Sequence, residues 1–500
     1  MRRLPLLMLF AAAALPSTVP AASAASTQAA GPAVRQLLVQ ARPDVAPLEC
    51  EKAAPVARRA TTPNPDPLEV PTAETVQSMS PNADMALAPG PIGARPSVPS
   101  VRPGAGVYRI GIWGDSHLAA NFFTEELLRQ LKAPADSVTN TLIPATMNRA
   151  GVRLPLLRSC VSSQWKYEPN YVGGDSAAAP GPGLANMFAD APGATLAWDL
   201  RKTAQSLGYE RVRLLYQGRE TPLVVGISVD GGAEQEVTLA AAPGPAALEL
   251  VADLPISQVK LRLLDGRLRF NGLELLPHDP APFGMDVFGY PGATVAGWKL
   301  TNQDYLASWF TRDQYQLVIL EFGTNEGNVK PFDLAAYRKT LVESVANMKA
   351  RFPSAACVLV APGDRGVLVP RSANIRKAQT RKEREAQAKV KGTKKKAAQI
   401  DLLQYSRIHA DIGRVQAEVA QDAGCSAWSM LDAMGGQGKA YEWARQSPAL
   451  MAKDLIHFTV AGYQRLAQQF FKDMGWVALP EAAIRAESRD NSGLPVPPGP

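Results

Sequence analysis

The sequence has few of the residues that build metal or redox centres. Only four cysteines and four histidines occur among 500 residues. The cysteines form no C-x-x-C motif and no cluster with histidine; they are Cys50, Cys160, Cys357 and Cys425. This spacing gives no metal site, and we therefore expect neither a metal ion nor another cofactor.

Long hydrophobic runs are also missing, except at the N-terminus. Two arginines precede an apolar run at residues 4–15, and Ala22-Ser23-Ala24 offers a small-x-small cleavage site. This pattern predicts a secretory signal peptide over residues 1–24. A membrane anchor would need about 18 or more apolar residues, and Pro16 ends this run sooner. We therefore expect an exported protein, periplasmic or secreted.

An oxidising compartment would permit disulfides, but the sequence leaves the pairing of the four cysteines open. Cys357 and Cys425 each open an apolar segment that we expect to be a buried strand. We expect these two to pack as small hydrophobic side chains rather than to serve as reactive thiols.

A general excess of one charge is absent as well. The net charge is +7, but residues 371–396 hold 11 Lys/Arg against 2 Asp/Glu, so the rest of the chain is slightly acidic. We interpret 371–396 as a solvated basic insertion, with contact to an anionic polymer or a membrane surface as the second interpretation. Nucleic acid is not expected as a partner, because the segment lacks interleaved aromatic residues.

The 42 prolines are unevenly spread, with 16 in the first hundred residues and 4 in the last twenty. No sustained period of 2 or 3.6 is present over 25–105, which predicts a Pro/Ala-rich disordered linker there. The same reasoning predicts a flexible tail over 479–500.

The remainder predicts an α/β protein interrupted by a β domain. A strand at 107–113 and a helix at 122–132 come first, within an α/β part expected over 106–159. Short β-like runs separated by turns such as Asp230-Gly231-Gly232 then predict an antiparallel β-sandwich over 160–277.

The α/β rhythm returns over 278–478. Nearly continuous apolar runs at 316–322 and 356–361 are typical of buried parallel strands, and a further strand is expected at 425–431. Helices are expected at 333–351, 400–423 and from Thr459 onward, where apolar residues recur at helical spacing. We therefore expect a parallel sheet flanked by helices, a flavodoxin-like three-layer fold.

Gly114-Asp115-Ser116-His117 follows the first expected strand and precedes a helix. Such a turn exposes a hydroxyl beside main-chain N–H groups, as a nucleophile requires. Taken alone, such a motif is more often a simple turn or helix cap than a catalytic site.

The base is expected from Asp454-Leu455-Ile456-His457, which precedes the last helix. An Asp three residues before a His can fix the imidazole tautomer, while the other ring nitrogen faces a serine. A capping Asp in a surface turn is the alternative interpretation.

Two glycine turns complete the set. Asn325 follows Gly323 directly after the strand at 316–322, where its amide could donate to a developing oxyanion. Gly292 lies in a turn after residues 286–289, and its main-chain N–H is a second candidate donor.

Together these four blocks resemble the SGNH (GDSL-like) hydrolase superfamily. The resemblance implies a catalytic triad of Ser116, Asp454 and His457, and an oxyanion hole formed by Ser116, Gly292 and Asn325. Within this superfamily, the chain is most similar to bacterial peptidoglycan O-acetylesterases, in which a carbohydrate-binding-module-like sandwich separates the first two blocks. The resemblance covers about residues 105–478, and the insertion at 371–396 departs from it.

The resemblance implies an esterase that removes O-acetyl groups from a cell-wall polysaccharide, with acetylated peptidoglycan as the expected substrate. Two alternatives stay open. The same triad could transfer acetyl groups onto a polysaccharide, or the chain could be a non-catalytic glycan-binding protein.

Overall fold

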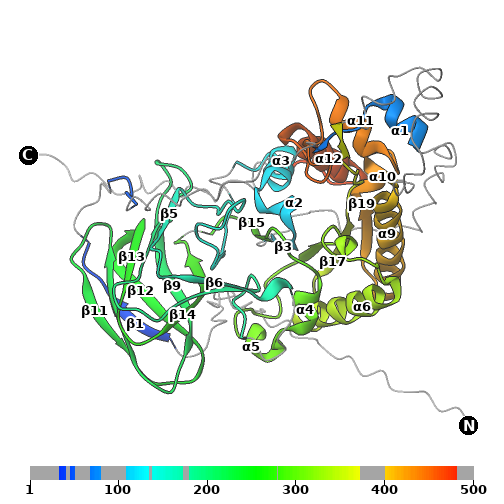
Figure 1. Cartoon of the computed structure of the whole chain (residues 1–500). Helices are drawn as coiled ribbons and strands as arrows, with labels where there is room; N and C mark the ends of the chain where they lie inside the picture. Colours follow the sequence, from blue (N-terminus) through cyan, green and yellow to red (C-terminus); the bar gives the residue numbers. More distant parts are fainter. Residues whose placement is uncertain are drawn as a thin grey trace, which may run out of the picture.

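A computed structural model describes residues 33–40, 46–50, 68–79, 108–134, 138–172, 179–278, 280–371 and 400–480. The predicted signal peptide (1–24) lies outside these residues, as do the basic insertion beyond Arg371 and the tail beyond residue 480. Figure 1 shows an α/β part and a β part lying side by side. No helix within the described ranges is long and apolar enough to cross a membrane.

Five parallel strands form the central sheet of the α/β part, in the spatial order β15-β3-β16-β17-β19. Their bounds are β3 Tyr108–Gly114, β15 Phe283–Gly289, β16 Leu317–Glu321, β17 Ala356–Ala361 and β19 Ser426–Ser429. Numbered along the chain, this order is 2-1-3-4-5, the flavodoxin-like arrangement. The expected fold class is confirmed.

Helices cover both faces of this sheet (Figure 1). The helices are α2 Ser116–Ala119, α3 Phe122–Gln130, α4 Ala296–Leu300, α5 Gln303–Ala307, α6 Leu334–Arg351, α9 Gln404–Ala423, α10 Met430–Ala433, α11 Lys439–Arg445 and α12 Val460–Asp473, with short 3-10 turns at Asn170–Val172 and Glu326–Asn328. Asp333 caps α6 and Thr459 caps α12, because the side chain of each accepts a main-chain N–H from the first helical turn. These N–H groups have no partner within the helix.

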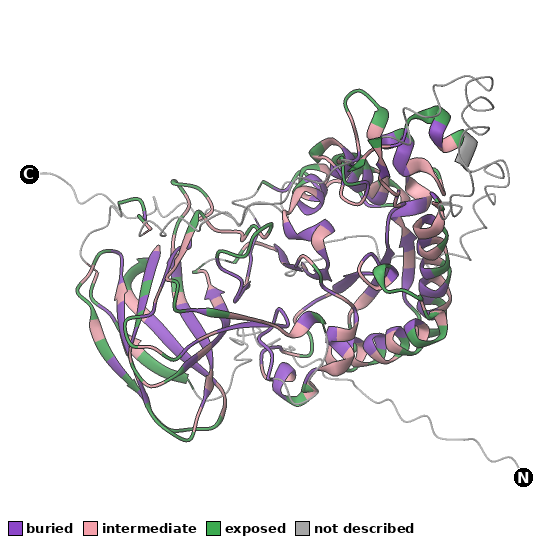
Figure 2. Cartoon of the chain, in the orientation of Figure 1, coloured by how far each residue is buried: buried purple, intermediate pink, exposed green. Residues whose placement is uncertain are grey.

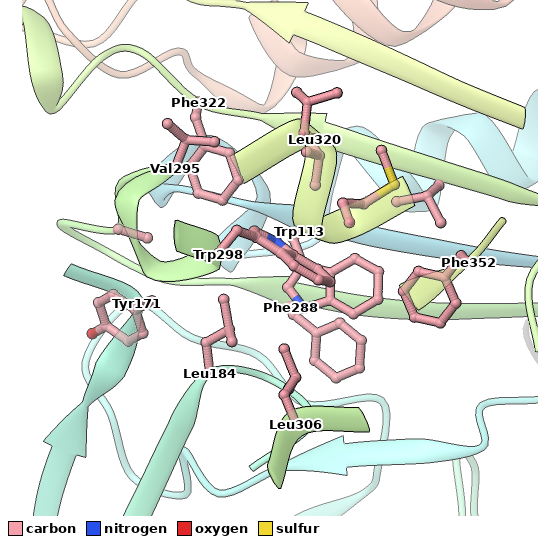
Figure 3. Packing of buried hydrophobic residues seen from close by; sticks show 14 of the residues in the cluster. Trp113, Tyr171, Leu184, Phe288, Val295, Trp298, Leu306, Leu320, Phe322 and Phe352 are labelled. Atoms are coloured by element: carbon pink, nitrogen blue, oxygen red, sulfur yellow. The ribbon is translucent and has the colours of Figure 1, made fainter. Parts of the chain in front are cut away.

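The apolar strands pack into two layers because successive side chains alternate between the faces of the sheet. Val318 and Leu320 of β16 join the core beneath α6 and α9, whereas Leu317 and Ile319 join the core beneath α3 and α12. All five residues of β16 are buried, and Figure 2 shows buried residues along the central strands of the α/β part. In the first of these cores, Trp113 lies among aromatic rings that include Phe288 and Trp298 (Figure 3).

The β part contains a seven-stranded and a five-stranded sheet that enclose one apolar core. Its strands are β1 Ala33–Leu37, β4 Leu142–Pro144, β5 Arg158–Val161, β6 Lys166–Pro169, β7 Ala185–Ala189, β8 Thr195–Asp199, β9 Tyr209–Gly218, β10 Leu223–Val229, β11 Gln235–Leu239, β12 Gly244–Ile256, β13 Gln258–Asp265 and β14 Leu268–Leu276. Strands β8 to β14 lie within 160–277, where the sequence predicts short β-like runs separated by turns.

The N-terminal linker predicted over 25–105 is partly wrong. Residues 33–37 form β1, which pairs in parallel with β12, so the sandwich is not wholly antiparallel. Strand β2 (Leu68–Glu69) pairs with β18 (Val369–Pro370), and α1 covers Ala73–Met79. These pieces are too short to show a period, and β1 is ordered by pairing with β12 of the β part.

The predicted boundaries of the β part and of the tail also shift. Strand β4 at residues 142–144 pairs with β14, although 106–159 was expected to belong to the α/β part. Leu479, expected in a flexible tail, is buried, and its N–H donates to the carbonyl of Leu131. In both places backbone pairing, which composition does not reveal, decides the boundary.

The cysteines form two disulfides, Cys50–Cys160 and Cys357–Cys425. Cys357 and Cys425 are buried in the apolar core as expected, but they are bonded to each other rather than packed as free side chains. They meet because Cys357 lies in β17 and Cys425 immediately precedes β19, its neighbour in the sheet.

Candidate active site

The serine turn is shaped by a close approach of two strands. β3 ends at Gly114, where a Cβ atom would lie 2.6 Å from Oε2 of Glu321 and 2.5 Å from Leu118. Only glycine fits there. Asp115 then caps α2 by accepting the N–H of His117 at 2.9 Å, and Ser116 opens the helix with its side chain partly exposed.

Three predicted residues lie in one hydrogen-bonded series. The Nε2 atom of His457 lies 2.9 Å from Oγ of Ser116, and its Nδ1 lies 2.7 Å from Oδ2 of Asp454. A proton on Nδ1, donated to the carboxylate, leaves Nε2 free to accept the Ser116 hydroxyl proton. The structure thus brings together residues 341 positions apart in the chain.

The carboxylate of this series is held by its own turn. Oδ1 of Asp454 accepts the main-chain N–H groups of Ile456 and His457, each at 3.0 Å. Partial burial alone would raise the pKa of Asp454, but these hydrogen bonds and the one from the His457 ring lower the pKa below its usual value. Asp454 therefore carries the negative charge that an imidazolium on His457 requires.

Gly292 and Asn325 lie on adjoining loops. The N–H of Tyr290 donates to the carbonyl of Gly114 at 3.2 Å, which holds the Gly292 loop beside the serine turn. Nδ2 of Asn325 donates to the carbonyl of Ala293 at 2.8 Å. An amide nitrogen carries two protons, so one donor of Asn325 is left over. Gly292 has a φ of 85°, a left-handed conformation that favours glycine.

Behind the serine turn lies a pair of buried carboxyl groups that the sequence reasoning missed. The N–H of Asp115 donates to Oε2 of Glu321 at 3.1 Å. Burial raises the pKa of Asp115 to about 6, and burial together with the charge of Asp115 raises the pKa of Glu321 well above its usual value. Two charges this close together in a buried site repel each other, so the raised pKa of Glu321 favours its protonated form beside Asp115.

A third acid connects the two loops of the site. Glu326 accepts the N–H of Val295 at 2.8 Å and the N–H of Gly323 at 3.1 Å. It therefore joins the segment after Gly292 to the turn that precedes Asn325. Burial raises the pKa of Glu326 to about 7. The sequence gives little sign of the two buried glutamates: Glu321 is the last residue of an apolar strand, and Glu326 lies in the turn that follows it.

The other histidines lie outside the relay. His117 is buried, its Nδ1 lies 3.2 Å from the Tyr463 hydroxyl, and burial lowers its pKa to about 3. His409 is also buried, with its pKa lowered to about 4 by burial, and His278 lies on the surface. Within the described ranges no three His, Cys, Asp or Glu side chains gather as a metal site would require.

The fold and site thus define a flavodoxin-like α/β protein with a Ser-His-Asp relay at the carboxyl edge of its parallel sheet. No family model matches the sequence, and no curated protein matches it.

Several solved structures are similar to this chain. A peptidoglycan O-acetylesterase is 19% identical with a TM-score of 0.48, and the match covers 81% of this chain and 97% of that one. A family two carbohydrate esterase from Cellvibrio japonicus is 12% identical over 64% and 98%, with a TM-score of 0.22. A lipase/acylhydrolase from Enterococcus faecalis is 14% identical over 39% and 76%, also with a TM-score of 0.22.

Proposed function

We propose that this protein is a serine esterase of the SGNH (GDSL-like) type. The observation that carries the proposal is the hydrogen-bonded series from Asp454 through His457 to Ser116. Nucleophile, base and orienting acid stand at hydrogen-bond distance in the order that acyl transfer requires. Gly292 and Asn325 lie on the adjoining loops, where donors to an oxyanion are needed.

The reaction proceeds through an acyl-enzyme. Oγ of Ser116 attacks the acetyl carbonyl while Nε2 of His457 accepts the hydroxyl proton. The main-chain N–H groups of Ser116 and Gly292 and the free amide proton of Asn325 stabilise the oxyanion. The proton on His457 then passes to the leaving sugar oxygen. Water, activated by the same histidine, hydrolyses the acetyl-serine and releases acetate.

The substrate we propose is an O-acetyl group on a cell-wall polysaccharide, namely peptidoglycan. The β part supports this choice, because all its strands except β1 lie between Ser116 and Gly292 in sequence, as in the peptidoglycan O-acetylesterases that the sequence resembles. We also propose that the protein is exported. The signal-like segment at residues 1–24 supports export, and so do the two disulfides, which persist in oxidising compartments.

Acetate release by the purified mature chain tests this function. We expect release from O-acetylated peptidoglycan to exceed release from other acetylated polysaccharides. Ser116→Ala and His457→Asn should each lower the rate about 10⁴-fold or more, whereas His278→Asn, which alters a surface histidine outside the relay, should leave it unchanged. Activity of Ser116→Ala near the wild-type rate would show that another group is the nucleophile.

A further inference from the structure

The loop after β17 carries an arginine that the acyl-transfer steps do not use. Residues 362–366 read Pro-Gly-Asp-Arg-Gly and lie at the carboxyl edge of the sheet, as do the turns of Ser116 and Asn325. Nε and Nη1 of Arg365 are buried and have no hydrogen-bond partner within the described part of the chain. The residue as a whole is partly exposed, and a guanidinium without an ionic partner favours a ligand of opposite charge.

The backbone on both sides of Arg365 is fixed. The carboxyl group of Asp364 is buried and accepts hydrogen bonds from Ser406 of α9 and from a main-chain N–H of α11. The N–H of Gly366 donates to the carbonyl of Leu455 at 3.0 Å. Leu455 belongs to the turn that carries the triad acid and histidine, so Arg365 is anchored directly beside that turn.

An aromatic ring holds the arginine side chain in place. Cζ of Arg365 lies 3.9 Å from the ring centroid of Tyr405, and Nζ of Lys330 lies 4.4 Å from the same centroid. Lys330 follows Asn325 by five residues. Tyr405 thus contacts one cation from the segment after Asn325 and one from the loop beside the Asp454 turn. Burial lowers the pKa of Arg365, and the charges of Tyr405 and Asp454 oppose this shift.

We propose that Arg365 is a substrate-binding residue that pairs with a carboxylate of the acetylated glycan. Two carboxylate oxygens match the planar fork of a guanidinium, and stacking on Tyr405 removes most of the rotational freedom that binding would otherwise cost. The inference rests on the proposed esterase function and narrows it. In peptidoglycan the matching acid is a muramic acid unit whose lactyl carboxylate carries no stem peptide. The enzyme favours acetyl esters of such acidic sugars over those of neutral ones.

Binding of two sugars tests this role without turnover. N-acetylmuramic acid carries a lactyl carboxylate that N-acetylglucosamine lacks. We expect calorimetry or ligand-observed NMR on the full mature chain to show about tenfold or tighter binding of the acidic sugar. Arg365→Gln should remove this preference. Arg407→Gln should not, because Arg407 is an exposed arginine of α9 that is paired with Asp401.

A second variant separates a loss of binding from a loss of folding. Arg365→Lys keeps a cation near Tyr405 but loses the fork, and we expect it to retain part of the preference with the thermal unfolding of the wild type. An unchanged preference in Arg365→Gln, or a wild type that binds both sugars equally, would overturn the role of Arg365 even if acetate release is confirmed. An Arg365-dependent preference in a chain that releases no acetate would support the binding role and contradict the esterase.

Discussion

At the scale of single residues, the site depends on acids that never touch a substrate. Asp115 and Glu321 lie behind the serine turn, and both are buried. A proton on Glu321 removes the repulsion of two buried charges. The turn that presents Ser116 therefore lies against a carboxyl group whose raised pKa favours the protonated form.

This arrangement predicts a pH dependence of stability. Glu321 has a raised pKa in the folded state, so above the ordinary value of about 4.3 the folded chain binds a proton that the unfolded chain has lost. Stability then falls as pH rises, by about 1.4 kcal/mol per pH unit. Glu321→Gln mimics the protonated acid and removes the part of the slope that belongs to Glu321. The neighbouring acids Asp115 and Glu326, whose charges act on Glu321, remain in the variant.

Urea unfolding at pH 5 and pH 8 checks this prediction. As pH rises, the free energy of unfolding should fall less in Glu321→Gln than in the wild type. Glu442→Gln, which alters an exposed acid of α11, serves as the control and should show the wild-type slope. Parallel slopes for wild type and Glu321→Gln would mean that Glu321 is ionised in the folded protein.

At the scale of elements, long and strongly patterned segments were predictable, whereas short edge segments were not. Helix α6 starts after its cap Asp333 and β17 covers 356–361, as the sequence predicts. Strand β1 could not be found, because its five mostly exposed residues show no period and are ordered only by pairing with β12. Such segments depend on edges supplied by distant parts of the chain.

The disulfide between β17 and the start of β19 gives a test at this scale. It joins neighbouring parallel strands of the central sheet across 68 residues. We expect replacing both Cys357 and Cys425 by alanine to lower the free energy of unfolding by about 2–4 kcal/mol, measured by urea titration. A reducing agent should narrow the gap between wild type and variant. Identical midpoints without reductant would contradict a disulfide at this position.

At the scale of the whole molecule, the sequence predicted the relay better than its surroundings. Ser116 and His457 could be placed because each sits in a motif at the end of a regular element. Glu321 and Arg365 could not, because a glutamate and an arginine are common in turns and their burial depends on packing between loops far apart in sequence. The motif residues show which reaction is possible, and the packed loops determine how the site is held.

The most direct test of the central claim is covalent labelling by a fluorophosphonate, which reacts with hydroxyls activated by a base. We predict one label per chain, on the peptide that contains Ser116, with parallel loss of acetate release. Ser116→Ala and His457→Asn should stay unlabelled, and His278→Asn should react like the wild type. A chain that releases acetate but is labelled at another serine, or at none, would contradict the Ser116 relay.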